Sequence, residues 1–343
     1  MSVVHVAVDA HNLVRDDRGI GRYARAVLAR ALRVPGFRWS LVVRDLFPKR
    51  GTFARALDAA AVTVTRRVPR DADVVWFPWN GTFLRTALPT VATVHDAAPF
   101  AFPAANPRIR EAEQGPFRAT AASAKRILVQ SAFTAAEVQR WLGVAPDRIV
   151  VTPLAVDPIF TPGPADGLPV ELRGRRYVLH VGAHDPRKNT ATLVAAHERA
   201  FPDGEVTLAF TRTPPAMPRG GVVVEARDDA TLVALYRGAA LVALPSTYEG
   251  FGFPLLEAMA CGAPALAARA GALPEIGAEA AAYVERADDV AAWSDALRTL
   301  LADDVRLAEL AANGPARAAS FSWERCTAQT LAVLRATANA EAA

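Results

Sequence analysis

Residues 241–264 read LVALPSTYEGFGFPLLEAMACGAP, and this succession predicts a buried strand, a glycine-containing loop, a helix and the start of a second strand. Leu241–Leu244 is a short aliphatic run of strand length. Pro254 stands where proline is favoured, at the first position of a helix that we expect over 254–260. A strand that continues through a helix into the next strand is the unit of a parallel sheet.

The same alternation fills the rest of the second half of the chain. Further strands are predicted at Tyr177–Val181, Val206–Phe210, Val222–Glu225, Pro264–Ala267 and Ala282–Val284, and further helices at 190–200, 229–238, 288–301 and 304–318. Strands that alternate with helices are typical of an α/β domain with a parallel sheet.

The first half repeats this pattern. Strands are predicted at Val3–Asp9, Trp39–Arg44, Val62–Val68, Val74–Phe77, Thr90–His95, Ile127–Gln130 and Ile149–Thr152, and helices at 20–33, 107–124 and 132–142. Several of these strands are almost continuously apolar, which indicates burial on both faces of the sheet. We therefore predict two Rossmann-like, doubly wound domains, with the binding site in the cleft between them, at the carboxyl ends of the strands.

The length of 343 residues also favours two domains, since one hydrophobic core rarely grows that large. Five prolines and two glycines between Pro153 and Pro169 interrupt the alternation. We predict an N-terminal domain over 1–160, a Pro/Gly-rich linker over 161–172 and a C-terminal domain over 173–320. A last helix over 321–343 is expected to pack back toward the N-terminal domain.

Composition and charge exclude several classes of protein. With 52% hydrophobic and 22% charged residues, the chain is neither disordered nor fibrous. Residues 1–160 hold 22 Lys+Arg against 13 Asp+Glu, whereas the remainder holds 17 against 22. Cys261 and Cys326 fit neither a disulfide framework nor a metal site, and no apolar stretch has the length of a membrane span. We expect a cytoplasmic protein.

Two carboxylates of the quoted stretch are the first candidates for chemistry. Glu249 lies in the loop and Glu257 eight residues later in the helix, at most roughly 12 Å away by helical rise. Gly250 and Gly252 let the backbone approach a ligand closely, and the free amides at the helix start suit an anion or sugar hydroxyls. Carboxylates at this separation can hold two ends of one extended ligand.

The stretch resembles the E-x7-E signature of the retaining glycosyltransferases of family 4, which have the GT-B fold. The resemblance extends over most of the chain through these segments: VDAHNLVRDDRGIGRYARAVL near the start, TVHDAAPF at 93–100, VLHVGAHDPRKN at 178–189, LVALYRGAALVALPS before the signature, LPEI at 273–276 and FSWE at 321–324. Bacterial mannosyltransferase-like and rhamnosyltransferase-like members are the nearest in character.

The resemblance implies that 1–160 is the acceptor domain and 173–320 the nucleotide-sugar donor domain, and it implies a role for each matching residue. Glu257 would accept hydrogen bonds from the donor ribose, and Glu249 with the backbone of Gly250, Phe251 and Gly252 would hold the transferred sugar. Lys188 would lie on the diphosphate. The loop of Gly19 and Gly21 would face the diphosphate from the first domain, and His95 would lie at the reaction centre.

These roles imply a reaction and its requirements. His95, Lys188 and Glu249 are the implied catalytic residues of a hexosyltransferase that moves a mannose-type or similar hexose from a nucleotide-diphosphate sugar. The acceptor would be a hydroxyl of a glycan, glycolipid or lipid-linked saccharide, as in polysaccharide biosynthesis. Retention of configuration is expected, with no cofactor and no metal.

The sequence departs from the family pattern near the phosphate site. An arginine commonly follows the strand glycine, but Ala183 follows Gly182 here, so Arg187 is our candidate for the second phosphate clamp. The segment Phe210–Arg212 and Ala226 also differ from the common form. Because such segments frame the base, the donor nucleotide stays open among GDP, UDP, dTDP and ADP.

Acceptor recognition is the least legible part of the sequence. Asp96, Arg108 and Arg110 are candidates for acceptor binding. The basic segment 107–126 raises the hypothesis of peripheral contact with an anionic membrane at its inner face. A basic run interleaved with aromatic residues is missing, so we expect no nucleic-acid partner.

Three other interpretations remain as alternatives. Gly19–Ala24 fits G-x-G-x-x-A with Asp45 downstream, as in an NAD-dependent enzyme, but nine residues separate Gly19 from the predicted strand. Asp71 and Asp73 form a D-x-D pattern typical of metal-binding transferases, although they precede a strand. A catalytically degenerate partner or regulatory protein of the same fold is the non-enzymatic alternative.

Overall fold

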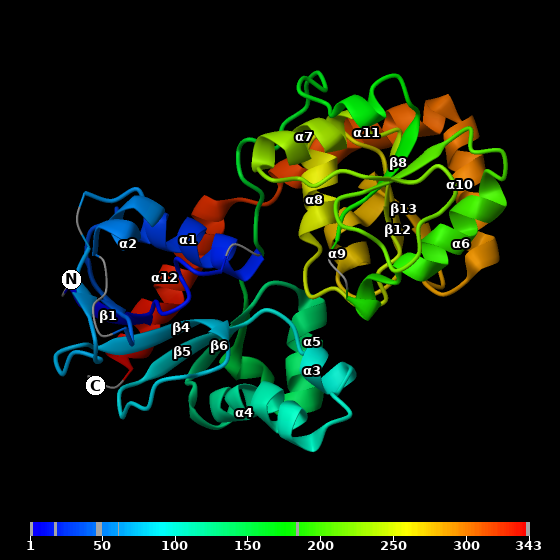
Figure 1. The fold of residues 1–343 in the computed structure, drawn as a ribbon. Helices are drawn as coiled ribbons and strands as arrows, with labels where there is room; N and C mark the ends of the chain where they lie inside the picture. Colours follow the sequence, from blue (N-terminus) through cyan, green and yellow to red (C-terminus); the bar gives the residue numbers. More distant parts are fainter. Residues whose placement is uncertain (1–2, 17–18, 46–49, 61, 183–184, 341–343) are drawn as a thin grey trace. The chain divides into compact units, whose positions relative to one another are not determined.

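The computed structural model describes residues 3–16, 19–45, 50–60, 62–182 and 185–340, and the chain divides into two compact units (Figure 1). The first unit comprises Met1–Leu154 with Ser322–Ala343, and the second comprises Ala155–Phe321. The predicted linker 161–172 falls within the second unit, where Arg237 Nε donates to the Thr161 carbonyl at 2.8 Å. The segment therefore packs against its unit, and a single 3-10 turn at Val170–Leu172 is its regular structure.

The first unit contains a parallel sheet in the order β3-β2-β1-β4-β5-β6-β7. Its strands are β1 (Val4–Asp9), β2 (Phe37–Val42), β3 (Val64–Thr65), β4 (Val74–Asn80), β5 (Thr90–Val94), β6 (Arg126–Val129) and β7 (Ile149–Val151). The chain first adds strands on one side of β1 and then continues from β4 on the other. The order of the strands therefore reverses between β1 and β4, and such reversal points are where open α/β sheets bind ligands.

Helices cover the two faces of this sheet unequally. They are α1 (Gly19–Ala31), α2 (Arg50–Ala56), α3 (Ala98–Ala101), α4 (Pro107–Ser123), α5 (Ala132–Leu142) and the C-terminal α12 (Trp323–Asn339). Figure 1 shows α12, in red, beside the blue α1, and both helices pack on β4. The connection between β4 and β5 contains no helix among its described residues.

The second unit repeats the architecture in the order β10-β9-β8-β11-β12-β13. Its strands are β8 (Tyr177–His180), β9 (Thr207–Phe210), β10 (Val222–Val223), β11 (Leu241–Leu244), β12 (Ala265–Ala268) and β13 (Ala282–Val284). Its helices are α6 (Thr190–Ala200), α7 (Asp229–Gly238), α8 (Phe253–Ala260), α9 (Leu273–Gly277), α10 (Val290–Ala302) and α11 (Asp304–Ala319). Here the strand order reverses between β8 and β11.

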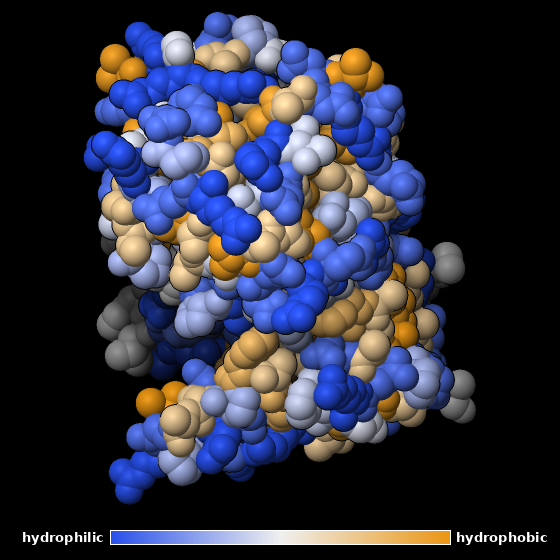
Figure 2. All heavy atoms as spheres, turned by 90° about the vertical axis from the view of Figure 1, so that its right-hand side faces the viewer, coloured by the Kyte–Doolittle hydropathy of each residue, from blue (hydrophilic) through white to orange (hydrophobic). Residues whose placement is uncertain are grey.

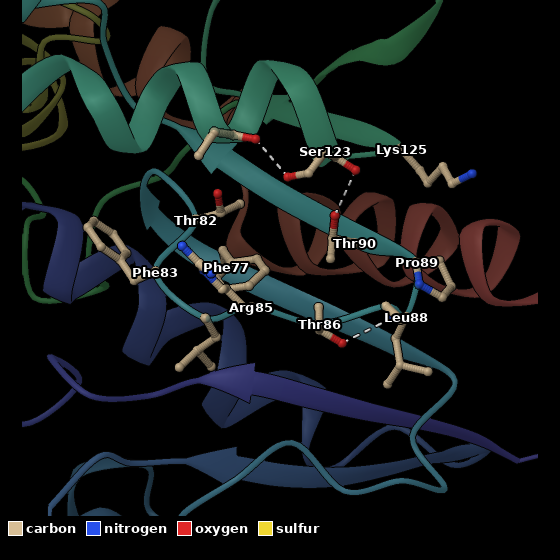
Figure 3. A pocket seen from close by; sticks show the side chains of 13 residues that line it. Phe77, Thr82, Phe83, Arg85, Thr86, Leu88, Pro89, Thr90, Ser123 and Lys125 are labelled. Atoms are coloured by element: carbon tan, nitrogen blue, oxygen red, sulfur yellow. Dashed lines mark hydrogen bonds between the residues drawn. The ribbon is translucent and has the colours of Figure 1, made fainter.

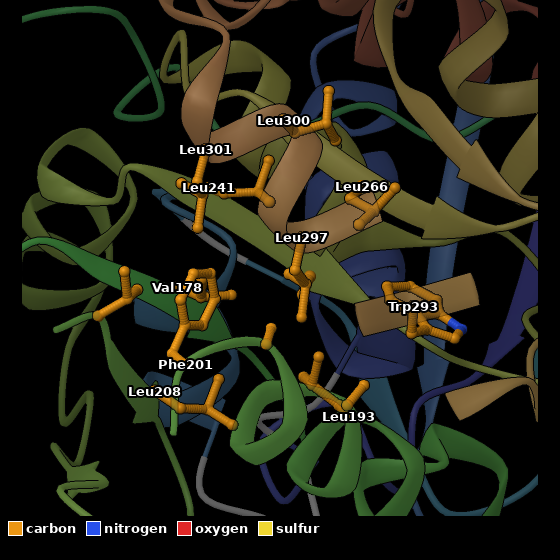
Figure 4. Close-up of a cluster of buried hydrophobic side chains, with 14 of the residues drawn as sticks. Val178, Leu193, Phe201, Leu208, Leu241, Leu266, Trp293, Leu297, Leu300 and Leu301 are labelled. Carbon is orange, nitrogen blue, oxygen red and sulfur yellow. The ribbon is translucent and has the colours of Figure 1, made fainter. Parts of the chain in front are cut away.

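One hydrophobic cluster fixes helices to this second sheet. Trp293 and Leu297 of α10 pack with Leu193 of α6 over Leu241 and Leu266 of the strands (Figure 4). All five side chains are at most 1% exposed. By the usual scale of about 25 cal/mol per Å² of buried apolar surface, each contributes about 1.5–3 kcal/mol.

The predicted fold class, two Rossmann-like doubly wound domains, is confirmed. The short helices α2, α3 and α9 were not predicted, because four to seven residues give too little periodicity for a helix to be recognised.

The face of the molecule in Figure 2 carries hydrophobic residues in small groups between hydrophilic ones. In the part of the chain that is described, no helix has both the length and the apolar character to cross a membrane.

Candidate active site

The loops that follow β8 and β11 meet at the reversal point of the second sheet, and they carry most of the predicted donor residues. β8 and β11 are direct neighbours, pairing at Val178–Leu241 and Leu179–Val242. Because both strands are parallel, the loop after His180 and the loop after Leu244 emerge at the same edge. The topology alone therefore brings together sequence segments about 60 residues apart.

Local hydrogen bonds give the first of these loops a defined shape. Asp185 caps a single turn at Pro186–Lys188, and Asn189 follows in the left-handed conformation with φ 52°. The side-chain amide of Asn189 donates through Nδ2 to the carbonyl oxygens of Pro245 at 3.2 Å and Ala287 at 2.6 Å. Asn189 thereby ties the loop after β8 to the loop after β11.

Lys188 and Glu249 form the central contact of the site. Lys188 Nζ lies 2.6 Å from Glu249 Oε1, and the two side chains are 18% and 15% exposed. The backbone on either side is held as well, because Thr247 N donates to the Arg187 carbonyl at 2.8 Å and Ala272 N to the Glu249 carbonyl at 2.9 Å. An ammonium and a carboxylate are thus held together where the strand order reverses.

A neutral histidine lies beneath this pair. His180 Nδ1 lies 3.0 Å from the Ala243 carbonyl and Nε2 lies 3.1 Å from Thr190 Oγ1. Burial, with a smaller contribution from the Lys188 ammonium, lowers the pKa of His180 to about 4, although the hydrogen bond to Ala243 and the Glu249 carboxylate oppose this shift. The ring therefore adds no second positive charge beside Lys188 at neutral pH.

Arg187, the candidate second phosphate clamp, is held by an aspartate. Its Nε lies 3.0 Å from both carboxylate oxygens of Asp185, and its Nη2 lies 2.5 Å from Oδ2. Burial raises the pKa of Asp185, but hydrogen bonds from Arg187 outweigh it and the net pKa is lowered. The position of Ala183, where the family arginine is missing, lies outside the described residues.

The glycine loop presents backbone rather than side chains. Phe251 is 5% exposed and packs edge-on against Phe253 and Phe321, with ring centroids 5.6 and 5.8 Å away. Gly252 has φ +101°, a conformation that side chains rarely adopt, and it caps α8. Of the predicted sugar-binding group, Gly250, Phe251 and Gly252 therefore offer amides.

Glu257 is buried, and sequence reasoning missed the residue that holds it. Its carboxylate is 5% exposed and accepts a hydrogen bond at 2.9 Å from the hydroxyl of Tyr236, which is fully buried in α7. The segment containing Tyr236 matches the family, but a tyrosine on an apolar helix face looks like core. A tyrosine hydroxyl that is buried usually has a polar partner, and that rule was the available signal.

A hollow of about 420 Å³ lies beside the loop that follows β8. It is lined by residues from the carboxyl ends of β8 and β9, namely His180, Gly182, Asp185, Pro186, Asn189, Thr190, Ala191, Phe210, Arg212, Thr213, Pro214 and Pro215. This volume is in the range of small-molecule sites. The segment Phe210–Arg212, predicted to frame the base, borders it.

The first unit places Gly19 and Gly21 at the reversal point of its own sheet. Both lie in the first turn of α1, after β1. A Cβ atom at Gly21 would lie 1.7 Å from the Asp16 carbonyl oxygen, so any larger residue would displace the preceding loop. The amides at this helix start suit an anion.

His95 follows β5, is buried and forms hydrogen bonds with residues of β4. Its backbone N–H donates to Asn80 Oδ1 at 2.6 Å, and its Nε2 lies 2.9 Å from the Pro78 carbonyl. Because a carbonyl only accepts, Nε2 carries the proton. Burial lowers the pKa of His95 to about 4, so the ring is neutral at neutral pH. Its catalytic role stays a prediction.

The acceptor candidates lie beyond His95. Asp96 Oδ1 accepts from Ala98 N at 3.0 Å, just before the start of α3, whose N-cap residue is Ala97. Arg108 is exposed and Arg110 half-buried, both in the first turns of α4. The structure therefore gives Asp96 a local structural contact and leaves Arg108 at the surface.

The motifs of the alternative interpretations have structural partners. Asp45, the candidate ribose ligand of an NAD enzyme, binds Arg15 at 2.8 and 3.0 Å. Asp71 binds Arg38 at 2.6 Å, and Asp73 accepts from the His5 backbone at 2.7 Å. Within the described residues, no group of three or more His, Cys, Asp or Glu side chains is arranged to hold a metal ion.

Comparisons with known proteins agree with this architecture. The family description Glycosyltransferase Family 4 matches residues 19–160, and Glycosyl transferases group 1 matches residues 222–317. The chain is 33% identical over 268 residues to the O-antigen chain mannosyltransferase B of Escherichia coli, covering 70% of this chain and 68% of that protein. It is 28% identical over 273 residues to a D-inositol 3-phosphate glycosyltransferase of Gordonia bronchialis, covering 72% of this chain and 59% of that protein.

A solved structure shows the same fold over the full length. Sucrose-phosphate synthase from Thermosynechococcus elongatus superposes with a TM-score of 0.74 at 21% identity, over 98% of this chain and all of that one. The chain therefore belongs to glycosyltransferase family 4 and is a glycosyltransferase of the GT-B fold.

Proposed function

We propose that this glycosyltransferase moves a mannose-type hexose from a nucleotide-diphosphate sugar to an acceptor hydroxyl, with retention and without a metal. The contact between Lys188 Nζ and Glu249 Oε1 at 2.6 Å carries the proposal, because it holds a cation and a carboxylate at a ligand-binding position of the fold. The mannosyltransferase name of the Escherichia coli relative supports the choice of sugar.

Each residue of the second unit has a distinct task in this proposal. Lys188 stabilises the negative charge that develops on the departing diphosphate. Glu249 and the amides of Gly250–Gly252 bind hydroxyls of the transferred sugar. Glu257 accepts hydrogen bonds from the ribose, in the orientation that Tyr236 gives it. Arg187 serves as a second phosphate ligand once its guanidinium leaves the Asp185 carboxylate and binds the diphosphate.

The reaction is a substitution on one face of the sugar. The bond between the anomeric carbon and the diphosphate oxygen breaks, and the acceptor oxygen forms its bond on the same face. The departing phosphate takes the acceptor proton. Because the acceptor attacks on the same face, no protein carboxylate needs to become covalently bound. His95 and the helix start at Gly19 and Gly21 would contribute from the first unit.

The acceptor is proposed to be a glycan, glycolipid or lipid-linked saccharide. The O-antigen name of the Escherichia coli relative supports a saccharide acceptor. Arg108 on α4 is exposed, which suits contact with an anionic acceptor or membrane, and peripheral membrane contact belongs to this proposal.

Donor binding and transfer test the proposal separately. A thermal-shift panel of GDP, UDP, dTDP and ADP with their sugars should raise the melting temperature for one base, since a ligand at about 100 times its Kd adds roughly 2.7 kcal/mol. If no nucleotide stabilises the protein, the proposal fails. Binding without transfer to any saccharide would favour the degenerate partner protein.

Substitution of the candidate lysine tests the mechanism. Lys188→Ala should lower turnover on the order of 10²- to 10³-fold, by analogy with other deleted electrostatic donors. Arg175→Ala, which removes an exposed cation of the same unit, should leave turnover unchanged. An unchanged rate in Lys188→Ala would remove this residue from the mechanism, and loss of activity in EDTA would contradict metal independence.

A further inference from the structure

A hollowed region of the first sheet lies where a crossover helix would be expected. The connection from β4 to β5, at 81–89, runs over the sheet face as a loop. One hollow of about 550 Å³ separates this loop from the last turns of α4, and another of about 510 Å³ separates it from segment 66–70. Leu84, Arg85, Thr86 and Leu88 line both hollows.

The floor of this region is apolar. Phe77 of β4 is fully buried, and Leu84 and Leu88 of the loop pack partly on the same core. Figure 3 shows Phe77 and Arg85 between the loop and α4. Phe83, also in the lining, is 40% exposed. The exposed apolar surface of this region therefore comes mainly from Phe83, over a floor that belongs to the core.

Arginines surround this floor. We call the region the arginine groove and define it by Arg66, Arg67, Arg70 and Arg85 with the two hollows that they line. All four arginines are exposed. In the ranges that the structure describes, none of the four forms an ion pair with a carboxylate.

The acidic residues that follow Arg70 in sequence already accept hydrogen bonds from other groups. Asp71 accepts from Arg38 at 2.6 Å, and this hydrogen bond holds the pKa of Asp71 below its ordinary value. Asp73 accepts from the His5 backbone at 2.7 Å. The positive charge of the groove is therefore uncompensated within the described chain, in contrast to α4, where Arg118 binds Glu111 at 2.5 Å.

We propose that the arginine groove is a docking surface for the anionic phospholipids of a bilayer. Guanidinium groups bind phosphate oxygens in pairs, so Arg66, Arg67, Arg70 and Arg85 suit a layer of lipid phosphates. Phe83 suits the boundary between headgroups and acyl chains, where aromatic and basic residues together promote surface binding. Charge complementarity and apolar exposure thus favour the same occupant.

A nucleic acid fits the groove less well. Single-stranded binding sites stack bases on exposed aromatic rings along a basic track. Phe77 is buried, which leaves Phe83 as the exposed ring of the lining. The groove also belongs to the first unit, apart from the residues of the proposed donor site. The inference rests on the peripheral membrane contact of the proposed function and assigns that contact to the groove rather than to Arg108.

Vesicle co-sedimentation tests the inference on the full chain. We expect the protein to bind vesicles of phosphatidylglycerol and phosphatidylcholine in equal parts at low salt, and pure phosphatidylcholine vesicles far less. A basic residue near an anionic surface contributes roughly fivefold in partitioning, so Arg66→Gln, Arg67→Gln, Arg70→Gln and Arg85→Gln together should lower it on the order of 10²-fold.

A second quadruple variant provides the charge-matched control. Arg173→Gln, Arg175→Gln, Arg199→Gln and Arg219→Gln remove four exposed arginines of the second unit and should lower partitioning less than threefold. Equal losses in both variants would show unspecific attraction and overturn the inference. Absence of vesicle binding, or binding that the groove variant retains, would overturn it as well.

Two further measurements separate this inference from the proposed function. Lys188→Ala should bind vesicles like the unaltered protein, and the groove variant should keep its donor-induced thermal shift. The same thermal scan without donor shows whether the groove variant is folded. Vesicle binding without any donor shift would contradict the proposed function and support the groove, whereas the reverse result would contradict the groove alone.

Discussion

Tyr236→Phe removes a single oxygen atom from the candidate donor site. The phenyl ring keeps the packing of tyrosine, including the edge contact of Tyr236 with Phe160 at a centroid distance of 6.2 Å. The hydrogen bond to Glu257 Oε2 at 2.9 Å is lost. Tyr177 offers a matched control, because its buried hydroxyl donates to the neutral carbonyl of Leu235 at 2.7 Å.

The chemistry of the two acceptors sets the expected magnitudes. Glu257 is 5% exposed and Tyr236 fully buried, so water does not easily replace the lost donor. Hydrogen bonds to charged groups contribute about 1.5–3 kcal/mol and neutral ones about 0.5–1.5 kcal/mol. The free energy of unfolding should therefore fall by about 1.5–3 kcal/mol in Tyr236→Phe and by about 0.5–1.5 kcal/mol in Tyr177→Phe.

Donor affinity distinguishes a positioning role from a structural one. If Tyr236 orients Glu257 toward the ribose, Tyr236→Phe should weaken nucleoside diphosphate binding about tenfold, which corresponds to about 1.4 kcal/mol. Tyr177→Phe should leave the Kd unchanged. Urea unfolding gives the stability and calorimetric titration gives the Kd. Reduced stability with an unchanged Kd in Tyr236→Phe would refute the assigned role of Glu257.

Glu249→Gln should act oppositely on binding and on transfer, because it frees Lys188 for phosphate and removes a sugar ligand. We expect nucleoside diphosphate to bind more tightly by about threefold to fivefold, because an ion pair that is not fully buried contributes up to about 1 kcal/mol. Turnover should fall. Calorimetric titration and initial rates measure the two effects, and weaker binding would contradict competition for Lys188. Acid should destabilise the fold, because burial lowers the pKa of both His95 and His180 to about 4. Below the ordinary pKa of about 6.5 the unfolded chain takes up protons that the folded chain excludes, so the free energy of unfolding should fall from about pH 7 to about pH 4, by about 3 kcal/mol for each histidine at most. Urea unfolding across this pH range measures the slope, and a flat profile would show that these rings are protonated in the fold.

The sheets were predictable because their strands are buried on both faces. β1, β4, β5 and β11 are almost uniformly buried, and their sequences are mostly apolar, with His5 interrupting β1 and Thr93 interrupting β5. Such runs identify strands without any partner being known. The helix α2 was missed because seven residues that bury little more than Phe53 leave no periodic signal.

The candidate site was predictable where one motif holds the residues and unpredictable where packing does. The PRKN and EGFG motifs locate Lys188 and Glu249, and the structure brings the two side chains together. The hydrogen bond from Tyr236 joins residues 21 positions apart on different helices, which no local pattern reports. The lining of the arginine groove comes from several separate segments of the chain, and the connection from β4 to β5 that borders it has no helix. A local sequence pattern does not report such an arrangement.

Charge is distributed differently around the two surfaces that we propose to bind phosphate. In the second unit Lys188 is already neutralised by Glu249, so a diphosphate must compete for the ammonium, and the carboxylate must find sugar hydroxyls instead. That exchange favours a ligand that carries both phosphate and sugar over phosphate alone. The four arginines of the groove have no carboxylate partner in the described chain, so lipid phosphates can bind them without displacing an internal carboxylate. An internally paired cation therefore suits selection of one donor, and unpaired cations suit attachment to a surface of many like lipids.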